Sequence, residues 1–411
     1  MIETNFFFWV TLIFLIGTKV VEWIAEFLNT QEKDGLPAEV ADLYDPEEYE
    51  KSRRYEKEKT RLSFIEDVLS LGLLLVFWFL GGFGWLEGVV QSTDLHPVLA
   101  GLLYFLILMG VQWLLRLPFD LYDTFRIEEE FGFNRTTIGT YAGDQVKQWI
   151  LTIVLGGILG GAVLYLFQTA GDSAWIWCWG VFIGFNLVIL YIAPIWLMPL
   201  FYKFTPLEEG TLRESIENYA KKESFPVKEL FVIDGSRRSS KANAFFAGFG
   251  KNRRIALYDT LIEKQSVPEL VGVLAHEIGH YRLKHVPKMV GLSFFQAGLM
   301  FFLAGLFVGS SSLAVAFGVQ EPSVHTGLVF FGLLFSALSR VTNVGVQWLS
   351  RKHEFEADAF AAQTTGEGES LVSALKKLAR ENLSHLTPHP FYVFLHYSHP
   401  PLHERIRALR Q

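Results

Sequence analysis

Residues 62–115 read LSFIEDVLSLGLLLVFWFLGGFGWLEGVVQSTDLHPVLAGLLYFLILMGVQWLL, and this stretch contains no lysine or arginine. A helix needs about 20 apolar residues to cross the hydrocarbon core of a membrane, so the stretch can hold two crossings joined by a polar turn at 91–94. Two further stretches without lysine or arginine, 148–202 and 289–339, are long enough for two crossings each. With an earlier apolar segment at about 6–28, the sequence predicts seven transmembrane helices.

The composition agrees with a membrane protein. Half of the residues are hydrophobic, 15% are aromatic and only 19% are charged, which is well below the charge of a usual soluble domain. The net charge of −7 argues against binding to nucleic acid. Because Cys178 is the single cysteine, neither a disulfide framework nor a cysteine metal site is available.

The orientation follows from the loops. The first segment lacks the basic start and the small-residue cleavage site of a signal peptide, so we expect a retained span. The basic loops then fall on one side of the membrane, which the positive-inside rule assigns to the cytoplasm. We therefore expect the N-terminus outside, and the C-terminus and the large segment between the fifth and sixth spans inside.

That large segment contains the motif His276-Glu277-Ile278-Gly279-His280. On a helix the two histidines lie about 40° apart on one face, so that both imidazoles can bind one metal ion. Glu277 is placed to reach a water molecule on that metal, which is the arrangement of a zinc-dependent hydrolase. We expect one Zn²⁺ per chain.

Catalytic zinc needs a third protein ligand. The metzincin pattern fails, because Leu283 and Val286 stand where it requires glycine and histidine. His285 lies about 140° round the predicted helix from His280 and points away from the metal. We interpret it as a histidine at the helix end or one that supports the metal ligands from outside. Glu354 is the better candidate, with Asp358 four residues later to accept the other N–H of a liganding histidine. The alternative is that these acids form an exposed charged helix face.

Residues 203–287 are predicted to form a small α+β unit, with a helix at 207–223 and strands at 230–233, 242–249 and 254–258. The middle strand is expected at the edge of the sheet beside the metal. A peptide substrate could add to that edge through backbone hydrogen bonds. Ordinary hairpin packing is the alternative.

Four segments together resemble the type I CAAX prenyl proteases, which are integral-membrane zinc metalloproteases. The segments are 276–280, 354–358, 398–405 and IEEEFGFN at 127–134. The resemblance implies seven helices around a water-filled chamber. It also implies removal of the last three residues from a substrate that is prenylated at a C-terminal cysteine.

The resemblance also assigns roles to residues. His276, His280 and Glu354 match the zinc ligands, and Glu277 matches the catalytic glutamate that moves the proton of the attacking water. Asn243 and Ala244 match the substrate-strand motif. His399 is a candidate to stabilise the oxyanion, and we expect Arg405 to contact substrate. The alternative for these last two residues is a local role at the start of a helix, where Arg405 pairs with a neighbour.

We therefore expect a predominantly α, polytopic membrane protein with a cytoplasmic α+β zincin-like unit. The expected parts are 1–202 with five spans, 203–288 ending in the zinc helix, 289–350 with two spans, and 351–411 with the third ligand. Membrane lipids surround the protein, which we expect to function as a monomer.

Other functions remain open. A heat-shock-type quality-control protease shares the first two motifs, and a non-catalytic protein that clears a translocation channel could use the same chamber. Charged residues flank the zinc motif too closely for an intramembrane protease, and the spans lack the histidine cluster of a zinc transporter. A short chain and the ending ALRQ, with no retrieval signal, favour a bacterial protein of the plasma membrane.

Overall fold

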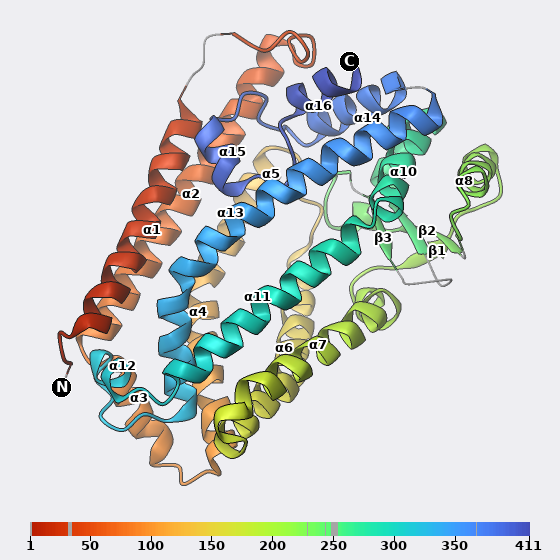
Figure 1. The fold of residues 1–411 in the computed structure, drawn as a ribbon. Helices are drawn as coiled ribbons and strands as arrows, with labels where there is room; N and C mark the ends of the chain where they lie inside the picture. The colour runs from red at the N-terminus through yellow and green to blue at the C-terminus, as the bar shows by residue number, and fades with distance from the viewer. Residues whose placement is uncertain (1, 32–34, 228, 243, 248–253, 367) are drawn as a thin grey trace.

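The structure is a computed structural model that describes residues 2–31, 35–227, 229–242, 244–247, 254–366 and 368–411. Seven helices in this described part are long and apolar enough to cross a membrane, which confirms the predicted number. They are α1 (Phe6–Thr30), α2 (Pro46–Phe79), α4 (Pro97–Tyr122), α6 (Ile138–Thr169), α7 (Ala174–Ile192), α11 (His285–Phe307) and α13 (Val324–Thr365). The two termini lie at opposite ends of the molecule, as an odd number of crossings requires (Figure 1).

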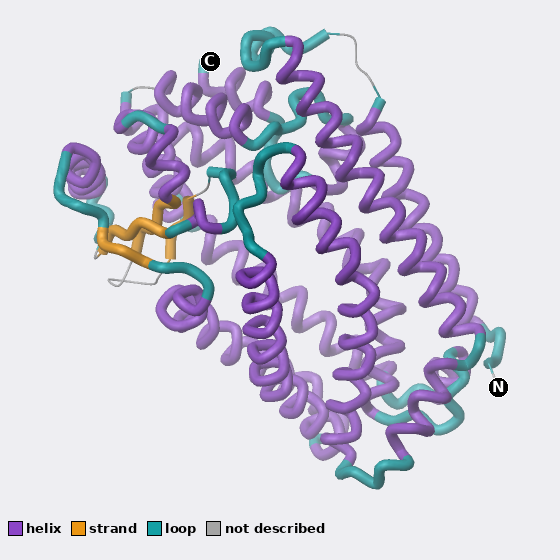
Figure 2. The backbone as a smooth tube through the Cα atoms, turned by 180° about the vertical axis from the view of Figure 1, so that it is seen from behind, coloured by secondary structure: helices purple, strands orange, loops and turns teal. Residues whose placement is uncertain are grey.

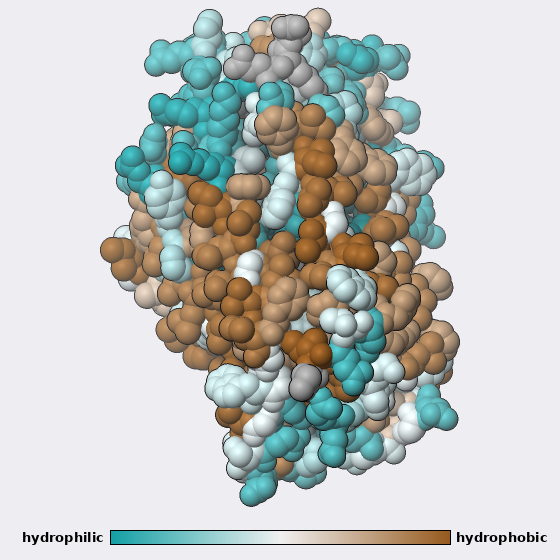
Figure 3. All heavy atoms as spheres, turned by 90° about the vertical axis from the view of Figure 1, so that its left-hand side faces the viewer, coloured by the Kyte–Doolittle hydropathy of each residue, from teal (hydrophilic) through white to brown (hydrophobic). Residues whose placement is uncertain are grey.

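The outer faces of these helices are apolar. On α6 the side chains of Ile150, Ile153, Val154 and Ile158 are 51–61% exposed, an arrangement that lipid stabilises and water does not. Figure 3 shows a wide apolar band between polar ends. Only 6–17% of the apolar window of each span is buried inside the protein, so the helices do not pack into a solid bundle.

The turns between paired spans contain more structure than the sequence predicted. α3 (Gly82–Gln91) and α12 (Ser311–Ala316) are extra short helices in the first and third turns. α3 packs against α2 and α4, and α12 packs against α1 and α13. Phe317, which follows α12, stacks on Trp78 at 4.5 Å and on Phe330 at 4.3 Å between ring centroids. This aromatic cluster closes the end of the molecule that lies far from the sheet.

The second turn is short, as expected, with a single 3-10 turn at Gly171–Ser173. After α4 and α7 the chain continues through π-helical turns at Asp123–Ile127 and Ala193–Leu197. The first of these leads into α5 (Glu128–Glu130), and the second leads through a 3-10 turn at Met198–Leu200 to the sheet.

A four-stranded sheet has the order β1-β2-β4-β3. The strands are β1 (Phe204–Pro206), β2 (Glu229–Ile233), β3 (Ala244–Ala247) and β4 (Arg254–Tyr258). β2 and β4 are parallel, whereas β1 and β3 pair antiparallel to them. β3 is therefore an edge strand, as the sequence predicted. β1 was not predicted. Figure 2 shows the sheet on the side of the molecule opposite the N-terminal helices.

Helices pack around the sheet and share a hydrophobic core with its strands. α8 (Thr211–Lys222), α9 (Asp259–Lys264) and α10 (Val267–Arg282) pack with the strands. Their shared core contains Ile216, Ile255, Leu261, Leu274 and Ile278, each at most 2% exposed. This core fixes α10, which carries the zinc motif, against the sheet.

The C-terminal part is helical: α14 (Gly368–Glu381), α15 (Pro390–His396) and α16 (Leu402–Leu409) follow α13. α13 runs without a break through 42 residues, so the expected boundary between 350 and 351 falls inside this helix. One helix therefore carries both the seventh crossing and the candidate ligand Glu354.

Candidate metal centre

The helix that carries the motif begins with a strong capping arrangement. Ser266 is the N-cap of α10, and the carboxylate of Glu269 accepts a hydrogen bond from the Ser266 backbone N–H at 2.7 Å. The same buried carboxylate accepts hydrogen bonds from Ser373 at 2.6 Å and Lys377 at 2.7 Å on α14. These donors outweigh the effect of burial and lower the pKa of Glu269 to about 2. α10 is thereby anchored at its first turn.

α10 and α13 approach each other closely at Gly279. A Cβ atom added there would lie 3.1 Å from the Cα of Ala357 and 3.1 Å from a ring carbon of Phe360. Glycine is therefore the residue that lets the two helices meet at this separation. The contact lies one residue from His280 and three residues from Glu354, so it sets the distance between the two halves of the site.

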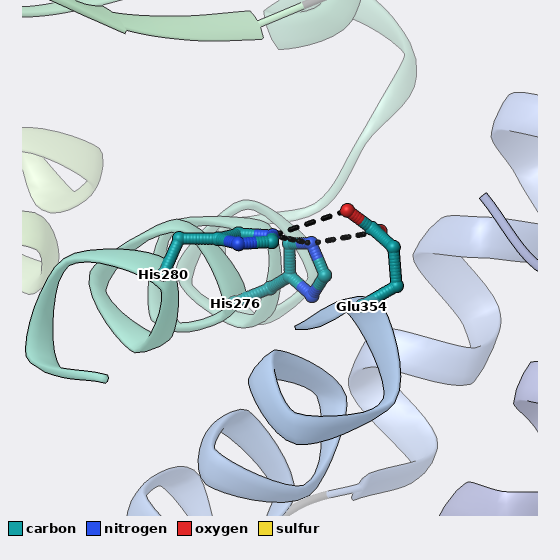
Figure 4. Close-up of side chains that lie close together, drawn as sticks. All are labelled: His276, His280 and Glu354. Atoms are coloured by element: carbon teal, nitrogen blue, oxygen red, sulfur yellow. Dashed lines mark hydrogen bonds and ion pairs between the residues drawn. The ribbon is translucent and has the colours of Figure 1, made fainter. Parts of the chain in front are cut away.

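The structure brings the three predicted ligands together (Figure 4). The Nε2 atoms of His276 and His280 lie 3.1 Å apart. Oε2 of Glu354 lies 3.4 Å from Nε2 of His276, and Oε1 of Glu354 lies 3.2 Å from Nε2 of His280. Ligands at about 2.0–2.1 Å from a tetrahedral zinc ion are separated by about 3.3–3.4 Å along the edges of the tetrahedron. One donor atom from each of the three residues lies within 4.8 Å of the other two, which is compatible with one shared zinc ion.

The donor atoms are also chemically free to bind a metal. Among the described residues, Oε2 of Glu354 is buried and accepts no hydrogen bond. The remaining nitrogen of His276, Nδ1, lies 2.8 Å from Oδ1 of Asp358 and donates its proton there. This leaves the lone pair of Nε2 pointing at the shared centre.

Asp358 is itself held by a buried arginine. The Nε and Nη2 atoms of Arg405 donate to its two oxygens at 2.8 and 2.7 Å. Burial opposes protonation of His276, but hydrogen bonds to Asp358 and Glu354 raise its pKa to about 9. In the absence of metal His276 therefore carries a proton on each ring nitrogen, and the proton on Nε2 must leave when metal binds.

His280 is supported in a different way. Its Nδ1 atom lies 3.0 Å from Nδ1 of His285. The other nitrogen of His285 lies 2.9 Å from Oε2 of Glu356. His285 thus supports a predicted ligand from outside, as one of its two interpretations expected, although it lies on a separate helix: α10 ends at Arg282 and Lys284 adopts a left-handed conformation with φ of 57°. His285 starts a new helix, and Pro287 in its first turn is the sequence signal that could have revealed the break.

Glu277 and His399 flank the donor atoms. Both line a cavity of about 750 Å³ that also contacts His276 and Glu354. Partial removal from water raises the pKa of Glu277, which favours its role as a proton acceptor and donor. Nε2 of His399 lies 3.4 Å from Oε1 of Glu354, while its Nδ1 contacts the Ser398 hydroxyl at 2.8 Å. The Nε2 edge of the His399 ring therefore faces the metal centre.

Comparison with known proteins agrees with this geometry. Residues 26–203 match the CAAX prenyl protease N-terminal region with five membrane helices, and residues 206–411 match peptidase family M48. The chain belongs to the M48 family of metalloproteases. A CAAX prenyl protease 1 homolog from Arabidopsis thaliana is 37% identical over 96% of this chain and 96% of its own length. The human CAAX prenyl protease 1 homolog is 34% identical over 91% of this chain and 88% of its own length.

A solved structure shows the same fold. The crystal structure of S. mikatae Ste24p superposes with a TM-score of 0.94 over 100% of both chains, at 32% sequence identity. This M48 protein is therefore a membrane metalloendopeptidase with seven membrane helices and a small sheet. The relatives named here come from a plant, an animal and a yeast, and they give no support to the predicted bacterial origin. The chain is also not short beside these proteins, since the match covers 88–96% of the length of the first two relatives.

Two substrate predictions have different outcomes in the structure of this M48 protein. Asn243 lies outside the described residues. Ala244 begins the edge strand β3 and pairs with Leu257 of β4. The other side of β3 has no neighbouring strand in the described sheet, so an extended peptide has backbone groups there to pair with.

Arg405 is held by acidic side chains inside the protein. Its side chain is 10% exposed and two of its nitrogens are engaged by Asp358. Its third terminal nitrogen faces Glu354 at 3.6 Å. This buried guanidinium is paired with the distant Asp358 and not with a neighbour in its helix, and it also lines the cavity, so substrate contact by Arg405 stays a prediction. The long-range pair of Asp358 and Arg405 was not predicted, since no periodicity links residues 47 positions apart.

Proposed function

We propose that this protein binds one zinc ion through His276, His280 and Glu354, and uses it to remove the C-terminal tripeptide from proteins prenylated at a cysteine. The observation that carries the proposal is the convergence of one donor atom from each of these three residues within 4.8 Å, beside the half-buried carboxyl of Glu277. The printed names of the relatives, which are CAAX prenyl proteases, support the substrate class.

A bound zinc ion would supply Lewis acidity, which lowers the pKa of a water molecule and polarises a peptide carbonyl. Glu277 accepts the proton of the attacking water and then delivers it to the amine of the leaving tripeptide. Burial raises the pKa of the Glu277 carboxyl, which makes it a better acceptor for the proton of the attacking water. His399 donates a hydrogen bond to the oxygen that gains negative charge.

The remaining residues position these groups. Asp358 accepts the Nδ1 proton of His276 and so fixes the tautomer that leaves Nε2 for zinc. Arg405 holds Asp358 by two hydrogen bonds, and we assign it this positioning role. The substrate peptide pairs with β3 along its open edge, and Asn243 and Ala244 remain the predicted residues of that contact.

The membrane arrangement is also part of the proposal. The zinc site and the C-terminus face the cytoplasm and the N-terminus lies on the other side, because the basic loops lie at the end of the molecule that holds the site. A monomer surrounded by lipid is sufficient, since one chain supplies every residue named above. The low burial of the seven spans supports a chamber between them. The division into 1–202, 203–288, 289–350 and 351–411 stays a prediction.

The test is cleavage of a farnesylated C-terminal CAAX peptide by detergent-purified protein. The same peptide without the farnesyl group is the matched substrate, and a zinc chelator and the variant Glu277→Ala are the matched controls. We expect cleavage of the farnesylated peptide alone, at the bond after cysteine, abolished by both controls. Equal cleavage of both peptides would indicate a general membrane protease such as a quality-control enzyme, and no cleavage of either would favour a channel-clearing role.

A further inference from the structure

A second cluster of metal-binding residue types lies directly beside the first. His285, at the start of α11, and His353 and Glu356, on α13, place their nitrogen and oxygen atoms within 4.8 Å of one another. The mechanism above uses none of the three. His285 contacts His280 through Nδ1 at 3.0 Å and Glu356 through Nε2 at 2.9 Å. His353 stacks on the His285 ring, with centroids 4.0 Å apart and planes 9° apart.

The directions of these hydrogen bonds are fixed once zinc binds His280. The metal takes the lone pair of Nε2, so the ring proton of neutral His280 sits on Nδ1 and is donated to Nδ1 of His285. His285 accepts at that nitrogen, so its own ring proton is on Nε2. That proton is donated to the carboxylate of Glu356. Every donor in the series therefore meets an acceptor.

We propose that His285 and Glu356 form a relay that holds the His280 imidazole in the tautomer and orientation that bind zinc. The proposal rests on the zinc site proposed above. In other zinc proteins a liganding histidine commonly donates its second N–H to a carboxylate, which fixes the ring and strengthens the ligand. Here His276 meets that condition directly through Asp358, whereas His280 meets it through an intervening histidine.

A second metal ion in this cluster fits the geometry less well. Both nitrogens of His285 already have partners, and binding a metal at Nε2 would break its contact with Glu356. The lone pairs of an imidazole lie in the plane of the ring. Because His285 and His353 are stacked face to face, their lone pairs lie in parallel planes and do not converge on one ion. The stacking instead restricts the tilt of the His285 ring.

The relay also explains the position of Glu356, two residues after the ligand Glu354 and so about 200° round the helix. Its side chain is 38% exposed, and Lys352 lies 3.8 Å from its other oxygen. The two acids therefore support the metal from two sides. Glu354 is a buried ligand of the metal. Glu356 lies on the more exposed side of α13 and acts on His280 through His285.

The experiment measures zinc content and zinc affinity of detergent-purified protein by competition with a chelator. The variants are His285→Ala, Glu356→Ala, the double variant and His353→Ala. We expect one zinc per chain in the unaltered protein and a loss of affinity of about 10- to 100-fold in His285→Ala, as for other supports of metal ligands. The double variant is expected to bind no more weakly than His285→Ala, because Glu356 acts only through His285. His353→Ala is expected to stay within about threefold of the unaltered protein.

Several results would overturn the relay. Unchanged affinity in both single variants would do so, as would additive losses in the double variant. Two zinc ions per chain, falling to one in His353→Ala, would show a second metal site instead. If His285→Ala does not fold, Glu356→Gln decides the question, because it keeps the shape and removes only the charged acceptor. Absence of zinc from the unaltered protein would contradict the proposed function itself, which separates the two failures.

Discussion

Gly279→Ala tests whether the close contact of α10 and α13 sets the metal geometry. The added methyl would lie 3.1 Å from the Cα of Ala357, so the helices must move apart by a few tenths of an ångström. Overpacking of this kind costs about 1–3 kcal/mol. Alanine in place of glycine inside a helix returns about 1 kcal/mol. We therefore expect the free energy of unfolding to fall by about 0–2 kcal/mol.

Zinc affinity should fall together with stability. Zinc–ligand distances tolerate deviations of about 0.2 Å, and the separation moves His280 away from Glu354 by more than that. We expect zinc affinity to fall by about tenfold, measured by chelator competition, with stability followed by thermal unfolding of the same samples. Gly291→Ala on α11 is the control, because an added Cβ there meets nothing within 4 Å. A Gly279→Ala protein that is more stable than the unaltered one and binds zinc equally well would refute this reasoning.

The remaining predictions concern single side chains. Glu277→Ala should keep stoichiometric zinc and lose peptide cleavage, and full activity would remove Glu277 from the mechanism. His280→Ala should lose zinc as measured by metal analysis, and full retention would remove it from the ligand set. His399→Ala should lower kcat by about 100-fold with zinc retained, whereas an unchanged kcat would leave it a local role. The folded-state pKa of Glu269 is depressed to about 2, so its stabilisation is present above about pH 4.5 and lost as pH falls toward 2. In chelator-treated samples Glu269→Gln should be about 1–3 kcal/mol less stable at pH 7, and a difference that grows on acidification would contradict this assignment.

The sequence predicted the membrane architecture because lipid imposes a simple rule. Long runs without lysine or arginine have few outcomes other than membrane helices, and six of the seven crossings followed from them, while the first followed from its apolar composition. The strand at Arg254–Tyr258 was predicted with its observed ends, because it is a short apolar run. The strand β1 was missed, since the three residues Phe204–Pro206 carry no alternation and include a proline.

Within the site, the residues that lie on one helix were the predictable ones. His276, Glu277 and His280 share a face through their spacing, and Glu354 with Asp358 repeats the same spacing on α13. Arg405 and His285 reach the centre through tertiary packing, which no local pattern encodes. The helix break at Lys284 is signalled in the sequence only by Pro287, so a continuous helix through His285 was predicted.

α13 also connects the membrane-spanning part of the protein directly to the metal site. From Val324 to Glu354 the helix rises roughly 45 Å, so a tilt of one degree about the far end displaces Glu354 by about 0.8 Å. Membranes of different thickness tilt long helices by several degrees. The site can remain intact only if α10 travels with α13 as one unit, and Gly279 provides the tight contact between them. A change in lipid thickness that tilts α13 therefore displaces a metal ligand, and the contact at Gly279 determines whether the histidines of α10 move with it.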